Sequence, residues 1–136
     1  MAKTDTKEKY FEAVGRRKSA TARVRITPAD KFTYTVNGKK LDEAFDLETL
    51  QLDVQSPFKE VETSKEFSVS AKVMGGGIVS QAEAIRLGIA RALVKFNEDL
   101  RPNLKHAGFL KRDPRIKERK KFGKKKARKS PQWSKR

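Results

Sequence analysis

Cysteine is absent from this 136-residue chain, and His106 is its only histidine. Without cysteine there is no disulfide framework, thiol nucleophile or cysteine-based metal site. One histidine leaves too few nitrogen donors for an ordinary zinc or iron site. The sequence therefore predicts an intracellular protein without metal or other cofactor, in which His106 has a surface or structural role.

Long apolar runs are also missing, because none approaches the roughly 20 residues that a membrane-spanning helix needs. The first ten residues mix lysine with aspartate and glutamate. They have neither the apolar centre of a secretory signal nor the acid-poor pattern of a transit peptide. We therefore expect no membrane partner and no targeting segment, and we expect residues 1–9 to be a flexible N-terminus.

Acidic residues are scarce near the C-terminus. Residues 101–136 hold 16 of the 33 lysines and arginines but only two of the 17 carboxylates, which gives this segment a net charge of +14. The whole chain carries +16, so residues 1–100 carry only the remaining +2. The positive charge is therefore a local feature, and it predicts a polyanionic partner.

The first predicted element is a hairpin, because apolar and polar residues alternate from Tyr10 to Ile26. Its turn is expected at the basic stretch Gly15–Lys18. In the second arm the two-residue period sends Arg23 and Arg25 away from the core.

Two more alternating stretches predict strands over residues 32–36 and 67–73. The Asn37-Gly38 pair after the first is typical of a type I′ hairpin turn. The second runs into Gly75–Gly77, whose exposed amides could hold a phosphate. This glycine segment lacks the Gly-Lys-Ser/Thr ending of a Walker loop, so we interpret it as a tight strand-to-helix turn where RNA contact stays possible.

Helices are predicted in two regions. Irregular apolar spacing over Leu41–Pro57 predicts one or two short helices that end before the proline. A longer helix is predicted from Ser80 to Asn97, with Ser80 and Glu83 as a capping box, and a further helix is expected after it. This order predicts an α+β body over residues 10–109, with one sheet covered by helices.

Residues 110–136 are predicted to be an extended basic tail that is disordered in free solution. Its scattered apolar residues, Ile116, Phe122 and Trp133, cannot offset the entropy of ordering. They form no amphipathic stripe, which argues against a membrane-surface helix. Isolated aromatic residues among cations instead favour base stacking. Fully extended, the tail could reach on the order of 90 Å.

A second basic cluster is expected on the body, in the hairpin turn and on the outward face of its second strand. Two basic surfaces on one small chain favour a folded RNA, which proteins recognise mainly by shape and backbone. The carboxylates are not accompanied by a nucleophile or a metal partner, so the pattern predicts no enzyme activity.

Three segments carry a resemblance to a known family: YFEAVGRRKSATARVR from Tyr10, MGGGIVSQAEAIRLGIARAL from Met74, and the 36 residues from Arg101 onward. In content and order they resemble the bacterial-type ribosomal protein number nine of the small subunit. The resemblance implies a two-layer α+β body like the second domain of the fifth small-subunit ribosomal protein. It also implies a cytoplasmic location in the ribosome, where the body binds small-subunit rRNA in the head beside neighbouring ribosomal proteins.

The resemblance further implies that Ser134, Lys135 and Arg136 contact the anticodon stem-loop of peptidyl-site tRNA during translation. Cations at the tip of a long tail can neutralise phosphates without reading bases, as is needed when every tRNA must fit. The expected rRNA contacts are the cations of the body cluster and of the tail interior: Arg16, Arg17, Lys18, Arg23, Arg25, Lys111, Arg112, Arg115, Arg119, Lys120, Lys121, Lys124, Lys125, Lys126, Arg128 and Lys129.

Two other classes of function stay open at this point. A free nucleic-acid chaperone or DNA-compacting protein would use the same tail but would bind without a stoichiometric site. An enzyme is the other alternative, since small-molecule kinases share the predicted fold and place a glycine-rich loop there. This chain is short for their substrate domain, and it has no evident catalytic base.

Overall fold

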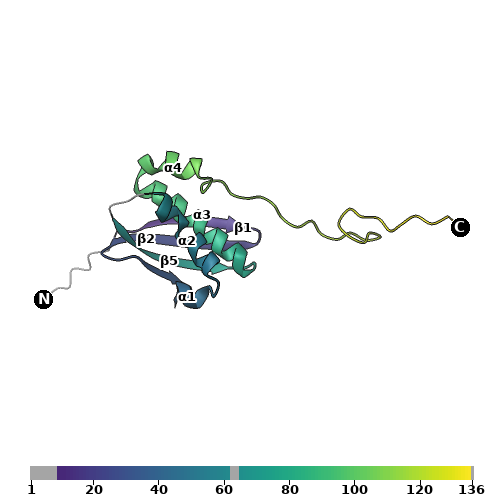
Figure 1. Cartoon of the computed structure of the whole chain (residues 1–136), viewed down its shortest axis with the longest axis horizontal. Coiled ribbons are helices and arrows are strands. Elements are labelled where there is room, and N and C mark those ends of the chain that lie inside the picture. The colour runs from purple at the N-terminus through teal and green to yellow at the C-terminus, as the bar shows by residue number, and fades with distance from the viewer. Residues whose placement is uncertain (1–8, 62–64, 136) are drawn as a thin grey trace.

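The computed structural model describes residues 9–61 and 65–135. It contains a mixed five-stranded sheet in the order β1-β2-β5-β3-β4, with helices packed against one face (Figure 1). The predicted α+β class is therefore confirmed. The strands are β1 (Phe11–Arg17), β2 (Ala20–Ala29), β3 (Thr33–Val36), β4 (Lys39–Lys40) and β5 (Glu66–Met74). The helices are α1 (Leu41–Ala44), α2 (Glu48–Glu60), α3 (Ile78–Phe96), the single 3-10 turn η1 (Glu98–Leu100) and α4 (Arg101–His106).

The first hairpin is confirmed, but its turn is shorter than predicted. β1 pairs antiparallel with β2 from Phe11↔Ile26 to Arg17↔Ala20, so only Lys18 and Ser19 remain in the turn. The predicted turn at Gly15–Lys18 is therefore wrong for its first three residues, which are strand. Because successive strand residues face opposite sides, Arg16 is exposed and Arg17 lies on the helix-covered side.

The second hairpin has the predicted turn. Asn37 and Gly38 both have positive φ angles, of 50° and 81°, as a type I′ turn requires. The Asn37 side chain also donates to the carbonyl oxygen of Val73 at 3.0 Å and accepts from its amide at 2.9 Å. In this way the turn extends the parallel pairing of β3 with β5, a pairing that the sequence did not reveal.

Helix α3 covers the sheet and begins one turn earlier than a capping box would place it. Gly77 is the residue before its first turn, and no side chain caps its N-terminus. Ser80 is buried inside the helix at 6% exposure, and Glu83 pairs with Arg17 of β1. The predicted capping box is thus wrong, because the helix begins before Ser80 and Glu83 pairs with Arg17. The predicted apolar stripe is confirmed by burial of Ala82, Ile85, Ile89 and Leu93.

Close approach of α3 to the sheet depends on two glycines. A Cβ atom on Gly15 would lie 1.8 Å from the carbonyl oxygen of Ala84, and one on Gly88 would lie 2.6 Å from Cγ2 of Val24. Real Cβ atoms do not approach other atoms so closely, so neither position accepts alanine without movement of the backbone or of a core side chain. Gly15 is therefore a packing residue in β1.

Two helices occupy the region after the second hairpin, as predicted, but α2 continues past Pro57 to Glu60. Proline cannot donate to the carbonyl oxygen of Asp53, and the Ser56 hydroxyl donates to that oxygen instead, at 2.6 Å. The extension is stabilised by burial of Pro57 and Phe58. The Phe58 ring stacks on Phe67 of β5 at a centroid distance of 5.6 Å, so core packing overrides the helix-breaking tendency.

Beyond α4 the chain leaves the body and extends away from it (Figure 1). Residues 111–135 contain neither helix nor strand, and nearly all of their side chains are exposed. No helix among the described residues is long and apolar enough to cross a membrane.

Candidate nucleic-acid interface

The uncovered face of the sheet is basic. Arg23 and Arg25 of β2 project from it with side chains 60% and 46% exposed, as the alternation predicted. Lys72 of β5 lies directly across from Arg23 in the antiparallel register. Together with Ser70, these three cations line a shallow hollow on the open face. Lys72 was not predicted as a site residue, although the alternation of polar and apolar residues in this strand placed it on the same face as Ser70.

The carboxylate of Glu12 partly neutralises this surface. One oxygen of Glu12 in β1 forms an ion pair with Nε of Arg23 at 3.1 Å, and the other accepts a hydrogen bond from Nε of Arg25 at 3.2 Å. The guanidinium of Arg25 also lies 4.8 Å from the ring centre of Tyr10, which is 50% exposed. Glu12 thus orients the two arginine side chains, and the ring of Tyr10 borders them. A cationic face of this kind suits contact with a nucleic-acid backbone. We call it the open-face cluster: Arg23, Arg25 and Lys72.

Arg17 is separated from that surface and joins the body to the start of the tail. Its side chain is 11% exposed, and its Nε lies 2.5 Å from the carboxylate of Glu83 in α3. Its other nitrogens contact the carboxylate of Asp113 at 3.5 Å and the carbonyl oxygen of Arg115 at 2.8 Å. The hairpin cations are therefore divided between two faces, with Arg16 and Lys18 exposed to solvent.

Asp113 is held ionised at this junction. Arg115 donates to both of its carboxylate oxygens: its Nε lies 3.1 Å from Oδ1, and its terminal nitrogen lies 2.8 Å from Oδ2. These hydrogen bonds hold the pKa of Asp113 well below its usual range, and Arg17 adds to the effect. The same pairing raises the pKa of Arg115. One of the two acidic groups of the tail thus serves to orient the chain.

The tail interior doubles back into a loop around its other carboxylate. Glu118 accepts from Lys121 and, at 2.8 Å, from Arg128. The amide of Lys125 donates to the carbonyl oxygen of Lys129 at 2.8 Å, and Lys124 donates to the Ser130 hydroxyl at 2.9 Å. Lys124 is half-buried in this loop, and the other predicted tail cations are exposed: Lys111, Arg112, Arg115, Arg119, Lys120, Lys121, Lys125, Lys126, Arg128 and Lys129.

The tip of the chain is fully accessible as far as it is described. Ser134 and Lys135 are exposed, and Trp133 beside them is 80% exposed. Arg136, the third predicted tRNA contact, lies outside the described residues.

The glycine segment is a tight turn, as predicted. Gly75 and Gly76 have positive φ angles of 80° and 65°, which glycine adopts without strain. A Cβ atom on Gly75 would lie 2.5 Å from the carbonyl oxygen of Ser19, and Gln81 donates to the Gly75 carbonyl at 3.1 Å. Glycine is therefore required at Gly75 and Gly76 because the turn packs closely against the first hairpin.

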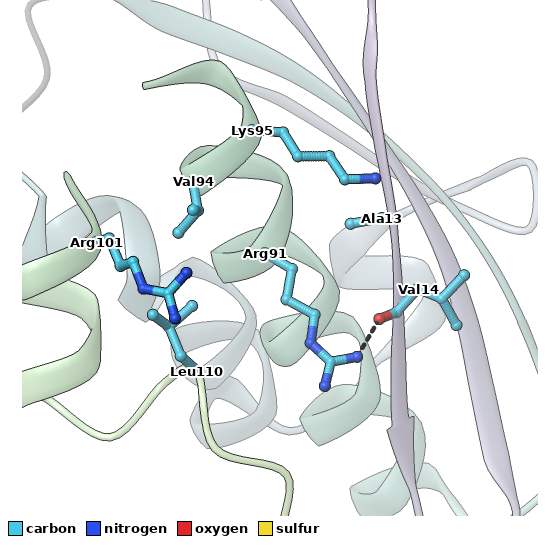
Figure 2. Close-up of a pocket in the computed structure, with 7 residues that line it drawn as sticks. All are labelled: Ala13, Val14, Arg91, Val94, Lys95, Arg101 and Leu110. Carbon is cyan, nitrogen blue, oxygen red and sulfur yellow. Dashed lines mark hydrogen bonds between the residues drawn. The ribbon is translucent and has the colours of Figure 1, made fainter. Parts of the chain in front are cut away.

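A groove of about 530 Å³ along the outer edge of β1 adds cations that the sequence analysis missed (Figure 2). Arg91 of α3 donates to the carbonyl oxygen of Val14 at 2.8 Å, and Lys95 donates to that of Glu12 at 2.6 Å. Arg101 lies on the opposite side, next to Leu110 at the start of the tail. The i, i+4 spacing of Arg91 and Lys95 was the available signal, but solvated helix faces have the same spacing.

The described residues contain no group of three or more His, Asp or Glu side chains that could hold a metal ion. In a comparison with known protein families, the model described as ribosomal protein S9/S16 matches residues 15–136, which include most of the body and all of the tail.

Proposed function

Because the chain belongs to the ribosomal protein S9/S16 family, it is a structural rRNA-binding component of the small ribosomal subunit, and we propose that its tail places its tip against peptidyl-site tRNA. Family membership also makes other ribosomal proteins its neighbours. The finer assignments, which concern the head of the subunit and the anticodon stem-loop, are part of this proposal. So is the likeness of the body to the second domain of the fifth small-subunit ribosomal protein.

The distribution of charge supports a division of labour between body and tail. The open-face cluster offers three cations on a rigid sheet, which suits docking on the backbone of folded rRNA. Exposed Arg16 and Lys18 extend this surface at the hairpin turn. We assign the rRNA contacts of the body to these five residues, of which Lys72 is an addition to the predicted set. Arg17 instead serves as a positioning residue, because its nitrogens already bind Glu83 and the start of the tail.

The tail interior supplies most of the phosphate contacts in this proposal. Sixteen cations lie in residues 101–136. If about eight of them met phosphates, the logarithm of affinity would fall with the logarithm of salt concentration with a slope of about −6. Contacts of this kind fix the path of the tail without reading sequence.

The tip then carries the proposed tRNA contact through Ser134, Lys135 and Arg136. The observation that supports it most directly is the exposure of Ser134 and Lys135 at the end of a segment that has left the body. A hydroxyl and cations bind phosphates of any tRNA equally well, so the contact would stabilise tRNA without selecting among species.

The test compares small subunits that carry the full chain with subunits whose chain ends at Ser134. Loss of Lys135 and Arg136 should weaken tRNA binding in the peptidyl site by about 10-fold, since two phosphate contacts at about 0.5–1 kcal/mol each are lost. Assembly should stay normal, because the rest of the tail is unchanged. A matched control, Lys39→Gln with Lys40→Gln, removes the same charge from exposed positions of β4 that have no assigned RNA contact, and it should leave tRNA affinity unchanged. Equal tRNA affinity of truncated and full-length subunits would refute the tip assignment.

A further inference from the structure

Phe122 is the most exposed large apolar side chain in the described part of the molecule. Its ring is fully exposed, whereas Phe109 at the end of the body is half-buried beside Arg86. An exposed phenylalanine in water leaves its whole apolar area uncovered, which is unfavourable relative to burial. A partner that covers this ring would therefore gain binding free energy.

The backbone presents this ring at a defined position. Phe122 precedes Gly123, whose φ of +75° forms a turn, and the amide of Lys124 donates to the carbonyl oxygen of Lys121 at 3.2 Å across it. Glu118 pairs with Lys121 on one side of the turn and with Arg128 on the other. The ring is thus at the tip of a braced loop, from which it points into solvent.

The surroundings of the ring restrict its partner to a polyanion. Residues 119–129 contain eight lysines and arginines and no carboxylate. An apolar pocket in a protein would cover a phenylalanine, but that protein would also have to supply carboxylates for the cations that Glu118 does not pair. A nucleic acid offers both features together, because each unpaired base has an apolar face and each nucleotide carries a phosphate.

We propose that Phe122 stacks on an unpaired base of the small-subunit rRNA, while the cations of the loop contact the phosphates around that base. The Glu118 pairs position the loop, and the φ of Gly123 turns the ring outward. This inference rests on the proposed path of the tail through rRNA, and it adds a specific aromatic contact to a path otherwise made of charge. Stacking of this kind is worth about 1–3 kcal/mol for each base.

The test measures binding of the full chain to small subunits assembled without it, over a series of salt concentrations. Phe122→Ala should raise Kd by about 5- to 140-fold, and Phe122→Tyr should restore it, since tyrosine keeps the aromatic face. Neither change removes a cation, so the salt slope should stay the same. In contrast, Lys124→Gln should reduce the magnitude of the slope by about 0.7. Ile116→Ala is the matched control for an exposed apolar tail residue and should leave Kd unchanged.

Chemical probing of the rRNA in the same particles identifies the partner of the ring. One base should be protected by the normal chain and by Phe122→Tyr and become reactive with Phe122→Ala. An unchanged Kd for Phe122→Ala would overturn the inference. A raised Kd without any newly reactive base would also overturn it, because that result would indicate that a protein pocket covers the ring. If a chain ending at Leu110 bound with the same Kd and salt slope as the full chain, the proposed tail path itself would be wrong.

Discussion

Arg17 links three parts of the chain, and its removal gives a quantitative test of how the tail is fastened to the body. We consider Arg17→Met, which keeps the length of the side chain and removes its charge. The change leaves the Glu83 carboxylate, which is 27% exposed, without its partner at 2.5 Å. Exposed ion pairs contribute about 0–1 kcal/mol, and loss of one member of a fully buried pair costs about 3–5 kcal/mol.

The Arg17–Glu83 pair lies between these limits, so we expect Arg17→Met to lower the free energy of unfolding by about 1–2 kcal/mol. For a body of this size that corresponds to a fall in Tm of about 4–16 °C. The Asp113 pair is longer, at 3.5 Å, and Asp113 keeps Arg115 as a closer partner at 2.8 Å. Asp113→Asn should therefore destabilise the chain much less than Arg17→Met.

Two double-mutant cycles measured by urea unfolding separate these contributions. The coupling free energy between Arg17→Met and Glu83→Gln should be about 1–2 kcal/mol, and that between Arg17→Met and Asp113→Asn should be several times smaller. Arg16→Met is the matched control, because this neighbouring arginine is exposed on the opposite face and should have no effect on stability. A coupling near zero for Arg17 and Glu83, or equal couplings in both cycles, would refute the reasoning.

Two further predictions concern the core and the pH dependence of stability. Gly15→Ala should lower the free energy of unfolding by about 3 kcal/mol or more, because its Cβ would lie 1.8 Å from the Ala84 carbonyl oxygen. Gly77→Ala is the control, because a Cβ atom there meets nothing within 4 Å. Equal urea midpoints for the two variants would contradict the packing argument. Burial raises the pKa of Tyr34 to about 12, above the value near 10 of the unfolded chain, so the folded state favours the neutral hydroxyl. The contribution of this pKa shift to the free energy of unfolding is fully present below pH of about 10 and is lost as pH rises from about 10 to 12. Ultraviolet titration should show one tyrosine ionising late, and Tyr34→Phe should remove that step; late ionisation that persists in the variant would contradict the assignment.

Much of the fold follows from local patterns that the sequence states directly. Alternation placed Arg23 and Arg25 on the open face, and Asn37-Gly38 specified the type I′ turn, because both depend only on neighbouring residues. The parallel pairing of β3 with β5 could not be predicted in this way. It joins segments separated by two helices, and no local pattern encodes such a distant partner.

The errors share one physical cause, which is that tertiary contacts override local preference. Pro57 normally ends a helix, but burial of Phe58 and a substitute hydrogen bond from Ser56 stabilise its continuation. Ser80 and Glu83 match a capping box, yet one is buried in α3 and the other pairs with Arg17.

The candidate interface was predictable only where local features of the sequence determine it. Concentration of charge in the tail is visible in composition, so its cations were identified without a structure. Arg16 and Arg17 lie on opposite faces because β1 continues to Arg17. A predicted turn that begins at Gly15 does not assign these two arginines to opposite faces. Arg91 and Lys95 could not be assigned, because only the position of the β1 edge distinguishes them from solvated helix residues.

Site-directed photo-cross-linking tests the proposal that the tip of the tail lies against tRNA in the peptidyl site. A benzophenone amino acid in place of Trp133 exchanges one exposed aromatic group for another and leaves Ser134, Lys135 and Arg136 intact. In small subunits with a filled peptidyl site, the account predicts a cross-link to the anticodon stem-loop of the tRNA, whereas the same group at Ile116 should cross-link only to rRNA or protein. Cross-links from position 133 to rRNA or protein alone, with tRNA at saturation, would contradict the account.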